Sequence, residues 1–187
     1  MQLTDYIMSY TVLDKTTCKN VVQQLDKEKW SKHTFVDYDD NFDDEIQKSP
    51  CLTLTKPTPV DKIVMDSLYD AIHEYVTIKG MPFFTKWAGY SNVKYNKYGV
   101  GNQMEKHADH IYSIFRNNAG IPKGIPILSI IGVLNNDYEG GEIEMFKDTK
   151  INLKAGEVII FPSVFLYPHK VCELTKGDRY SFVSWVY

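Results

Sequence analysis

The chain has few of the features that tie a protein to a membrane or to an oxidising compartment. It contains three cysteines, Cys18, Cys51 and Cys172, and no Cys-x-x-Cys pair. A sparse, odd set of this kind fits free thiols in a reducing compartment. No stretch approaches the roughly 20 apolar residues of a membrane span, and residues 1–10 lack the basic start and apolar run of a signal peptide. We therefore expect a cytoplasmic protein with no membrane partner.

The chain also lacks a large excess of positive or negative residues. The chain has 21 Lys and Arg against 24 Asp and Glu, which gives a net charge of −3. This balance provides no general attraction to phosphate backbones, so nucleic acid is not expected as a partner. Internal repeats and low-complexity tracts are absent as well. With 187 residues, the chain is predicted to form one domain, 1–187, that needs no disulfide or zinc to fold.

Helical patterns are confined to the first part of the chain. Thr16 or Thr17 is predicted to cap a first helix that ends near Trp30. Residues 60–79 carry apolar side chains at helical spacing and are followed by Gly80, which predicts a second helix and its end. The helical N-terminal part is therefore expected to cover about residues 1–80.

From about residue 81 the pattern changes to strands, with short runs rich in Val, Ile, Phe and Tyr between turn signals. The predicted strands cover 90–98, 105–113, 127–134, 142–146, 150–153, 158–161, 164–170 and 180–187. Many short strands at regular spacing predict an antiparallel sandwich or barrel. With two helices ahead of it, the fold class is α+β, a jelly roll with the N-terminal helices packed on one sheet. The acidic residues 37–45 predict a solvated loop, and residues 116–126 a lid.

Two histidines and one aspartate point to a metal site. His107 and Asp109 are two residues apart, and along a strand their side chains would share one face with Cα atoms roughly 6.6 Å apart. His110 would point to the opposite face. His169 lies in a predicted apolar strand, where an imidazole without a partner would be costly. His107, Asp109 and His169 are therefore the predicted metal ligands, since two His and one carboxylate form a facial triad.

Arg179 helps to choose between two candidate metals. Catalytic zinc and non-haem Fe(II) both accept two His and one carboxylate. Alternation along the last predicted strand places Arg179 on one face with Ser181 and Val183, and a guanidinium facing a barrel interior needs an anionic partner. A dicarboxylate cosubstrate that chelates the metal would offer its far carboxylate to this arginine. Arg179 therefore favours Fe(II).

The order and spacing of these residues resemble those of the Fe(II)/2-oxoglutarate-dependent dioxygenases, and within them the prolyl 4-hydroxylase-like branch. The matching segments are 95–101, 107–109, 134–142, 156–163, 169–171 and 176–180. The resemblance implies a double-stranded β-helix core over about residues 81–187. It also implies that His107, Asp109 and His169 bind Fe(II) and that Arg179 binds the distal carboxylate of 2-oxoglutarate.

Two further residues are carried over from the family. Tyr98, nine residues before His107, matches a tyrosine that also hydrogen-bonds the distal carboxylate, and Ser129 falls where a hydroxyl residue often assists. The resemblance implies O₂-dependent hydroxylation of an unactivated C–H bond with release of succinate and CO₂, and ascorbate is a further candidate cofactor. The expected substrate is a prolyl or other side chain in a peptide or protein. Two alternatives stay open: hydroxylation of a free amino acid or small metabolite, and a non-catalytic metal-binding jelly-roll module.

Overall fold

The structure is a computed structural model that describes residues 2–36, 42–43, 50–78, 87–109, 126–147 and 149–187. Gly80, His110, the predicted lid up to residue 125 and most of the acidic loop 37–45 lie outside these residues. The helices are η1 (Leu3–Tyr6), α1 (Lys15–Leu25) and α2 (Asp61–Ile78). The strands are β1 (Met8–Thr11), β2 (Ser31–Lys32), β3 (Phe35–Val36), β4 (Phe42–Asp43), β5 (Leu52–Leu54), β6 (Lys94–Tyr98), β7 (Met104–His107), β8 (Leu128–Val133), β9 (Tyr138–Gly140), β10 (Ile143–Met145), β11 (Thr149–Ile151), β12 (Glu157–Pro162), β13 (His169–Val171), β14 (Leu174–Gly177) and β15 (Arg179–Val186). None of the described helices has the length and apolar content of a membrane span.

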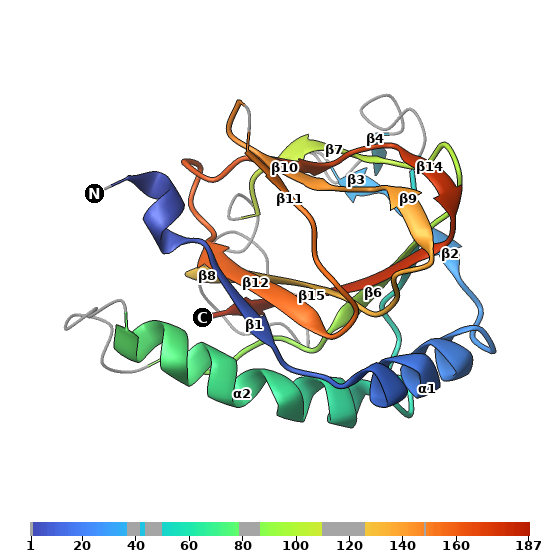
Figure 1. Cartoon of the computed structure of the whole chain (residues 1–187), viewed down its shortest axis with the longest axis horizontal. Helices are drawn as coiled ribbons and strands as arrows, with labels where there is room; N and C mark the ends of the chain where they lie inside the picture. Colours follow the sequence, from blue (N-terminus) through green and yellow to red (C-terminus); the bar gives the residue numbers. More distant parts are fainter. Residues whose placement is uncertain (1, 37–41, 44–49, 79–86, 110–125, 148) are drawn as a thin grey trace.

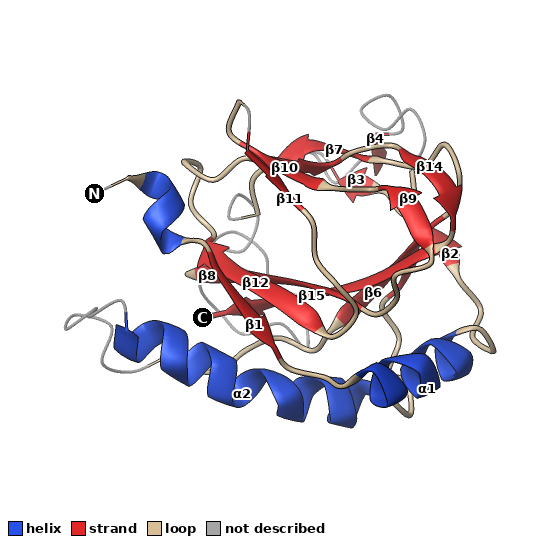
Figure 2. Ribbon diagram, viewed as in Figure 1, coloured by secondary structure: helices blue, strands red, loops and turns tan. Residues whose placement is uncertain are grey.

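Two antiparallel sheets face each other, and α1 and α2 cover the outer face of the larger one (Figures 1 and 2). The seven-stranded sheet has the order β1-β12-β8-β15-β6-β5-β2, and the four-stranded sheet has the order β11-β10-β13-β7. Two-stranded sheets, β14-β9 and β3-β4, complete the architecture. This arrangement confirms the predicted α+β class, a double-stranded β-helix with helices packed on one sheet.

The helices attach to the larger sheet through one apolar cluster. The cluster contains buried side chains of α1 (Cys18, Val21, Leu25), of α2 (Val64, Leu68, Ala71, Ile72, Tyr75) and of the sheet (Leu54, Tyr95, Leu128, Ile130, Val158, Ile160, Tyr180, Phe182, Val186). Because alternate residues of a strand point to opposite faces, the remaining positions of β8 and β15 face the space between the sheets. There Ile131, Val133 and Val183 pack with side chains of β12 and β10. Strand β8 is therefore buried on both faces.

The start of α1 differs from the prediction. The carboxylate of Asp14 accepts hydrogen bonds from the backbone N–H of Thr17, at 2.9 Å, and from its hydroxyl, at 2.7 Å. Asp14 is therefore the N-cap, and the prediction of Thr16 or Thr17 was wrong because an Asp three residues before an N–H donor caps as well as Thr does. The helix ends at Leu25, earlier than predicted, and Trp30 donates its indole N–H to the Leu25 carbonyl.

Several strands also differ from the prediction. The first 80 residues supply β1, β2 and β5 to the larger sheet in addition to the helices. The strand predicted over 105–113 ends at His107 among the described residues. In place of the strand predicted over 164–170, the strand runs over His169–Val171. Residues 164–166 form an exposed turn instead. Pairing with neighbouring strands, which the local sequence does not contain, decides these boundaries.

Gly132 is predicted to leave space for the Phe182 ring in the cluster between the helices and the larger sheet. It lies opposite Phe182 in the β8–β15 ladder, and a Cβ at position 132 would overlap the Phe182 ring. Gly132→Ala should therefore lower the free energy of unfolding by about 1–3 kcal/mol through overpacking, as measured by urea denaturation. Gly99→Ala is the control because its nearest atoms would lie at 3.6 and 3.8 Å. Equal losses in the two variants would contradict this prediction, and Phe182→Leu should restore part of the stability of Gly132→Ala.

Candidate metal and cosubstrate site

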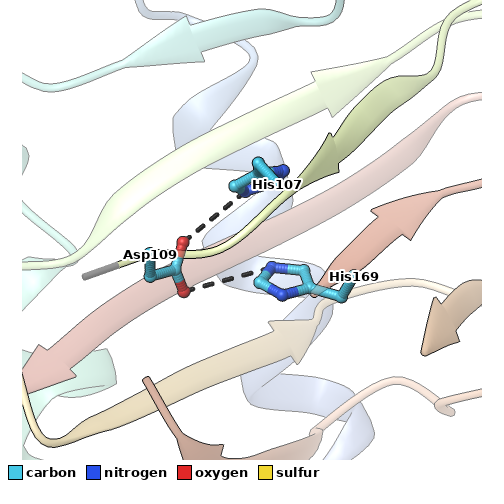
Figure 3. Close-up of side chains that lie close together, drawn as sticks. All are labelled: His107, Asp109 and His169. Carbon is cyan, nitrogen blue, oxygen red and sulfur yellow. Dashed lines mark ion pairs between the residues drawn. The ribbon is translucent and has the colours of Figure 1, made fainter. Parts of the chain in front are cut away.

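His107, Asp109 and His169 converge on one point between the two sheets (Figure 3). One ligand atom from each residue lies within 4.8 Å of the others. The Asp109 carboxylate is 3.5 Å from His107 Nε2 and 4.0 Å from His169 Nε2. Such a cluster of two imidazoles and one carboxylate is a donor set suited to a divalent transition metal.

The backbone brings these three side chains together in two ways. Strands β7 and β13 are neighbours, and His107 lies directly opposite His169 in their ladder. Asp109 lies in a turn that follows the end of β7. His107 and Asp109 therefore do not share one face of a continuous strand, as was wrongly predicted, although the two side chains do meet. The turn after His107 carries the carboxylate back toward both imidazoles.

Both imidazoles are oriented by backbone carbonyl groups. His107 Nδ1 lies 2.7 Å from the carbonyl oxygen of Glu105, and His169 Nδ1 lies 3.2 Å from that of Tyr167. A carbonyl can only accept, so each Nδ1 carries a proton, and Nε2 is the ring nitrogen left to bind a metal. This is the tautomer that a metal ligand needs, and the carbonyl contact also fixes the plane of the ring.

The ionisation of the three groups is set by burial and by their mutual contacts. Burial works to raise the pKa of Asp109, but His169, His107 and the Ser129 hydroxyl outweigh it and hold this pKa well below its usual range. Burial lowers the pKa of His169. It acts in the same direction on His107, but the contacts with Asp109 leave the pKa of that imidazole raised. An ionised carboxylate in a buried place calls for a positive partner.

Ser129 is connected to this cluster. Its hydroxyl donates to Asp109 Oδ2 at 2.6 Å and lies 2.6 Å from the hydroxyl of Ser163. The structure therefore places Ser129 against a predicted metal ligand, and its predicted assistance to the cosubstrate stays a prediction. Ser163 was missed in the sequence, where nothing distinguishes it from an ordinary turn residue.

Arg179 and Tyr98 lie on the opposing sheet. They are cross-strand partners in β15 and β6, and the guanidinium carbon lies 5.1 Å from the centre of the Tyr98 ring. Arg179 is 1% exposed, and within the described residues its Nε and Nη1 have no hydrogen-bond partner. A buried guanidinium with unpaired donors is costly, so the site fits a carboxylate at this point.

Residues 93–187 match the family model described as the 2OG-Fe(II) oxygenase superfamily. A PKHD-type hydroxylase of Prochlorococcus marinus (strain NATL1A) is 30% identical over 193 residues, covering 96% of this chain and 76% of the relative. A second, from the SARG strain of the same organism, is 30% identical over 191 residues, covering 97% of this chain and 77% of the relative.

Solved structures show the same fold at low sequence identity. A prolyl-4-hydroxylase of Pseudomonas putida superposes with a TM-score of 0.67 at 16% identity, covering 97% of this chain and 91% of that one. A prolyl hydroxylase of Trichoplax adhaerens, in complex with a peptide fragment of the hypoxia inducible factor oxygen degradation domain, gives 0.71 at 14% identity, covering 98% and 84%. The fold is thus that of the prolyl hydroxylases. The chain belongs to the 2OG-Fe(II) oxygenase superfamily.

The contact between Ser129 and Asp109 gives a prediction about metal affinity. Ser129→Ala removes the hydroxyl that orients Asp109, and loss of such an outer contact should weaken Mn(II) or Fe(II) binding by about 10-fold. Anaerobic metal titration measures the affinity. Ser184→Ala is the control, because Ser184 is also buried in the larger sheet but bonds only to Ser91. Unchanged metal affinity in Ser129→Ala would contradict the orienting role.

Proposed function

We propose that this chain is an Fe(II)- and 2-oxoglutarate-dependent hydroxylase. His107, Asp109 and His169 hold the iron, and Arg179 holds the distal carboxylate of the cosubstrate with help from Tyr98. The observation that carries this proposal is the buried guanidinium on the sheet opposite the triad, two of whose nitrogen atoms have no hydrogen-bond partner in the described part of the chain. A simple metal hydrolase has no use for such a group, whereas a metal-chelating dicarboxylate needs it.

The residues of the chain have separate tasks in this function. When bound, Fe(II) and 2-oxoglutarate supply the O₂-dependent oxidation of a C–H bond, with release of succinate and CO₂. His107 and His169 offer neutral nitrogen ligands, while Asp109 offsets part of the metal charge. The guanidinium of Arg179 fixes the far end of the cosubstrate, and the apolar side chains between the sheets keep bulk water out. Ascorbate is a candidate additional reductant.

A prolyl or other side chain in a peptide or protein is the proposed target. Two comparisons support this choice: the fold is similar to that of a prolyl hydroxylase solved with a peptide, and the sequence is 30% identical to that of a PKHD-type hydroxylase. Hydroxylation of a free amino acid or small metabolite is the second candidate, and the same site would serve it. A non-catalytic metal-binding module is the third. The buried Arg179, whose Nε and Nη1 find no hydrogen-bond partner among the described residues, speaks against it because such a module gains nothing from that group.

The proposed function predicts slow succinate formation even without the substrate. With Fe(II), 2-oxoglutarate and O₂, the protein should convert 2-oxoglutarate to succinate, as measured by mass spectrometry. His169→Ala and removal of the metal by a chelator should each abolish this conversion, because the facial triad needs all three ligands. Asp109→Gly should act in the same way. Succinate formation that survives in His169→Ala would show that the metal is held elsewhere.

The role of Arg179 predicts separate effects on the two cofactors. Arg179→Ala should raise the Kd of 2-oxoglutarate by about 100-fold or more, since a buried charge-assisted pair is lost. Metal affinity should change little, because Arg179 is no ligand. Calorimetry with the Mn(II)-loaded protein measures both constants. An equal loss of metal and cosubstrate binding would contradict the assigned role.

A further inference from the structure

Lys94 places a second positive charge on the inner face of the larger sheet. In the ladder between β6 and β15, Lys94 lies opposite Val183, and Tyr98 lies opposite Arg179. Val183 packs in the apolar cluster between the two sheets. Cross-strand partners share one face, and alternate residues of a strand do so too. Lys94 and Tyr98 therefore both face the space that contains the triad.

The charge of Lys94 acts on two of the proposed metal ligands. Burial lowers the pKa of Lys94, while the charge of Asp109 opposes this shift. Lys94 in turn works to lower the pKa of His107. The ammonium group thus interacts electrostatically with two of the three proposed ligands, although it forms no ion pair with either.

Among the described residues, no acidic group pairs with the ammonium group of Lys94. In the described part of the chain, its ammonium group has no hydrogen bond or ion pair. Lys97, on the other face of the same strand, lies 3.3 Å from the carboxylate of Asp26 and 3.5 Å from that of Asp178. The thiol of Cys51 also acts on Lys94, but burial raises the pKa of Cys51 to about 11 and keeps it neutral.

The proposed contents of the site are electrically balanced without Lys94. The metal dication and the Arg179 guanidinium are matched by the Asp109 carboxylate and the two carboxylates of 2-oxoglutarate. Lys94 therefore adds one positive charge that neither the described residues nor the cosubstrate compensate. Lys94 is partly buried, and a charge without a partner that faces the space between two sheets favours the binding of a further anion.

Other polar atoms near this place are also unpaired. Within the described residues, the buried Asn96 amide oxygen and the Trp185 indole nitrogen have no hydrogen-bond partner. Asn96 is the next inward residue of β6 after Lys94, and Trp185 lies opposite Ser129, whose hydroxyl bonds to Asp109. Lys94 and Trp185 thus offer donors and Asn96 offers an acceptor. Donors suit a carboxylate, and an acceptor suits an amide or amine N–H of the same molecule.

We propose that Lys94 determines substrate specificity by pairing its ammonium group with a carboxylate of the molecule that is hydroxylated. This inference rests on the proposed function and adds a charge requirement to it. The carboxylate could belong to a free amino acid, to the C-terminus of a peptide or to an Asp or Glu side chain. All three present the same group, and lysine recognises it as a compact point charge.

The first experiment asks whether Lys94 serves the cosubstrate instead. 2-Oxoglutarate is titrated into the Mn(II)-loaded wild type, Lys94→Met and Lys97→Met by calorimetry, with Lys97→Met as the control from the other face of β6. The Kd of both variants should stay within about two-fold of wild type. A rise of about 10-fold or more in the Kd of 2-oxoglutarate in Lys94→Met alone would overturn the proposal. Absence of 2-oxoglutarate binding in wild type would instead refute the proposed function.

The second experiment tests the carboxylate site directly. Acetate, with acetamide as its neutral counterpart, is added to protein saturated with Mn(II) and 2-oxoglutarate, and the paramagnetic relaxation of the methyl protons is measured. Wild type, Lys97→Met and the charge-preserving Lys94→Arg should relax acetate more strongly than acetamide. Lys94→Met should lose this difference. Equal relaxation of the two probes in wild type, or a difference retained in Lys94→Met, would overturn the proposal.

The third experiment identifies the source of the carboxylate. Acetate is displaced from the same loaded protein by free proline, by a tripeptide with a free C-terminus, and by an amidated tripeptide that contains Glu. The carboxamide or Gln counterpart of each competitor is the control. The competitor that displaces acetate at the lowest concentration identifies the source. Its neutral counterpart should need a concentration about 10-fold higher or more, which corresponds to the loss of one ion pair. Equal displacement by neutral counterparts, or no displacement by any competitor, would overturn the proposal.

Discussion

The pairing of β7 with β13 is the contact on which the geometry of the metal site depends. It places His107 opposite His169, and the carbonyl groups of Glu105 and Tyr167 then hold both rings in one tautomer. A slip of one residue in this ladder would send one imidazole to the other face of the sheet. The backbone hydrogen bonds of the four-stranded sheet therefore set the distance between the two nitrogen ligands.

The two sheets make different contributions to the site. The smaller sheet and the turn after it supply the proposed metal ligands, whereas the larger sheet supplies the cations Arg179 and Lys94. The helices α1 and α2 pack on the outer face of the larger sheet, and Ser129 connects this sheet to Asp109. Because the charged groups stand on ordered strands, their spacing can match that of a particular anion without the cost of ordering a loop.

Much of the fold class and the principal cluster could be predicted from the sequence. Histidine is rare in this chain, with five residues in 187, and the spacing of His107, Asp109 and His169 singled them out. The structure brings the three together. The turn at Asp109 could not be predicted, because the local sequence does not distinguish a turn at this point from a strand that continues. Lys94 was missed for another reason. In the sequence it is one of two lysines in a predicted strand, and only the register with β15 shows that it faces inward while Lys97 faces outward.

The match to the oxygenase family begins at residue 93, yet the structure does not divide there. Strand β1 forms one edge of the larger sheet, β5 pairs with β6, and α1 and α2 bury the outer sides of β8, β12 and β15. The segment that contains the chemistry is therefore not autonomous, since alone it would leave a broad apolar wall in water. Changes in the N-terminal half can then alter the reaction centre through the sheet that both halves build.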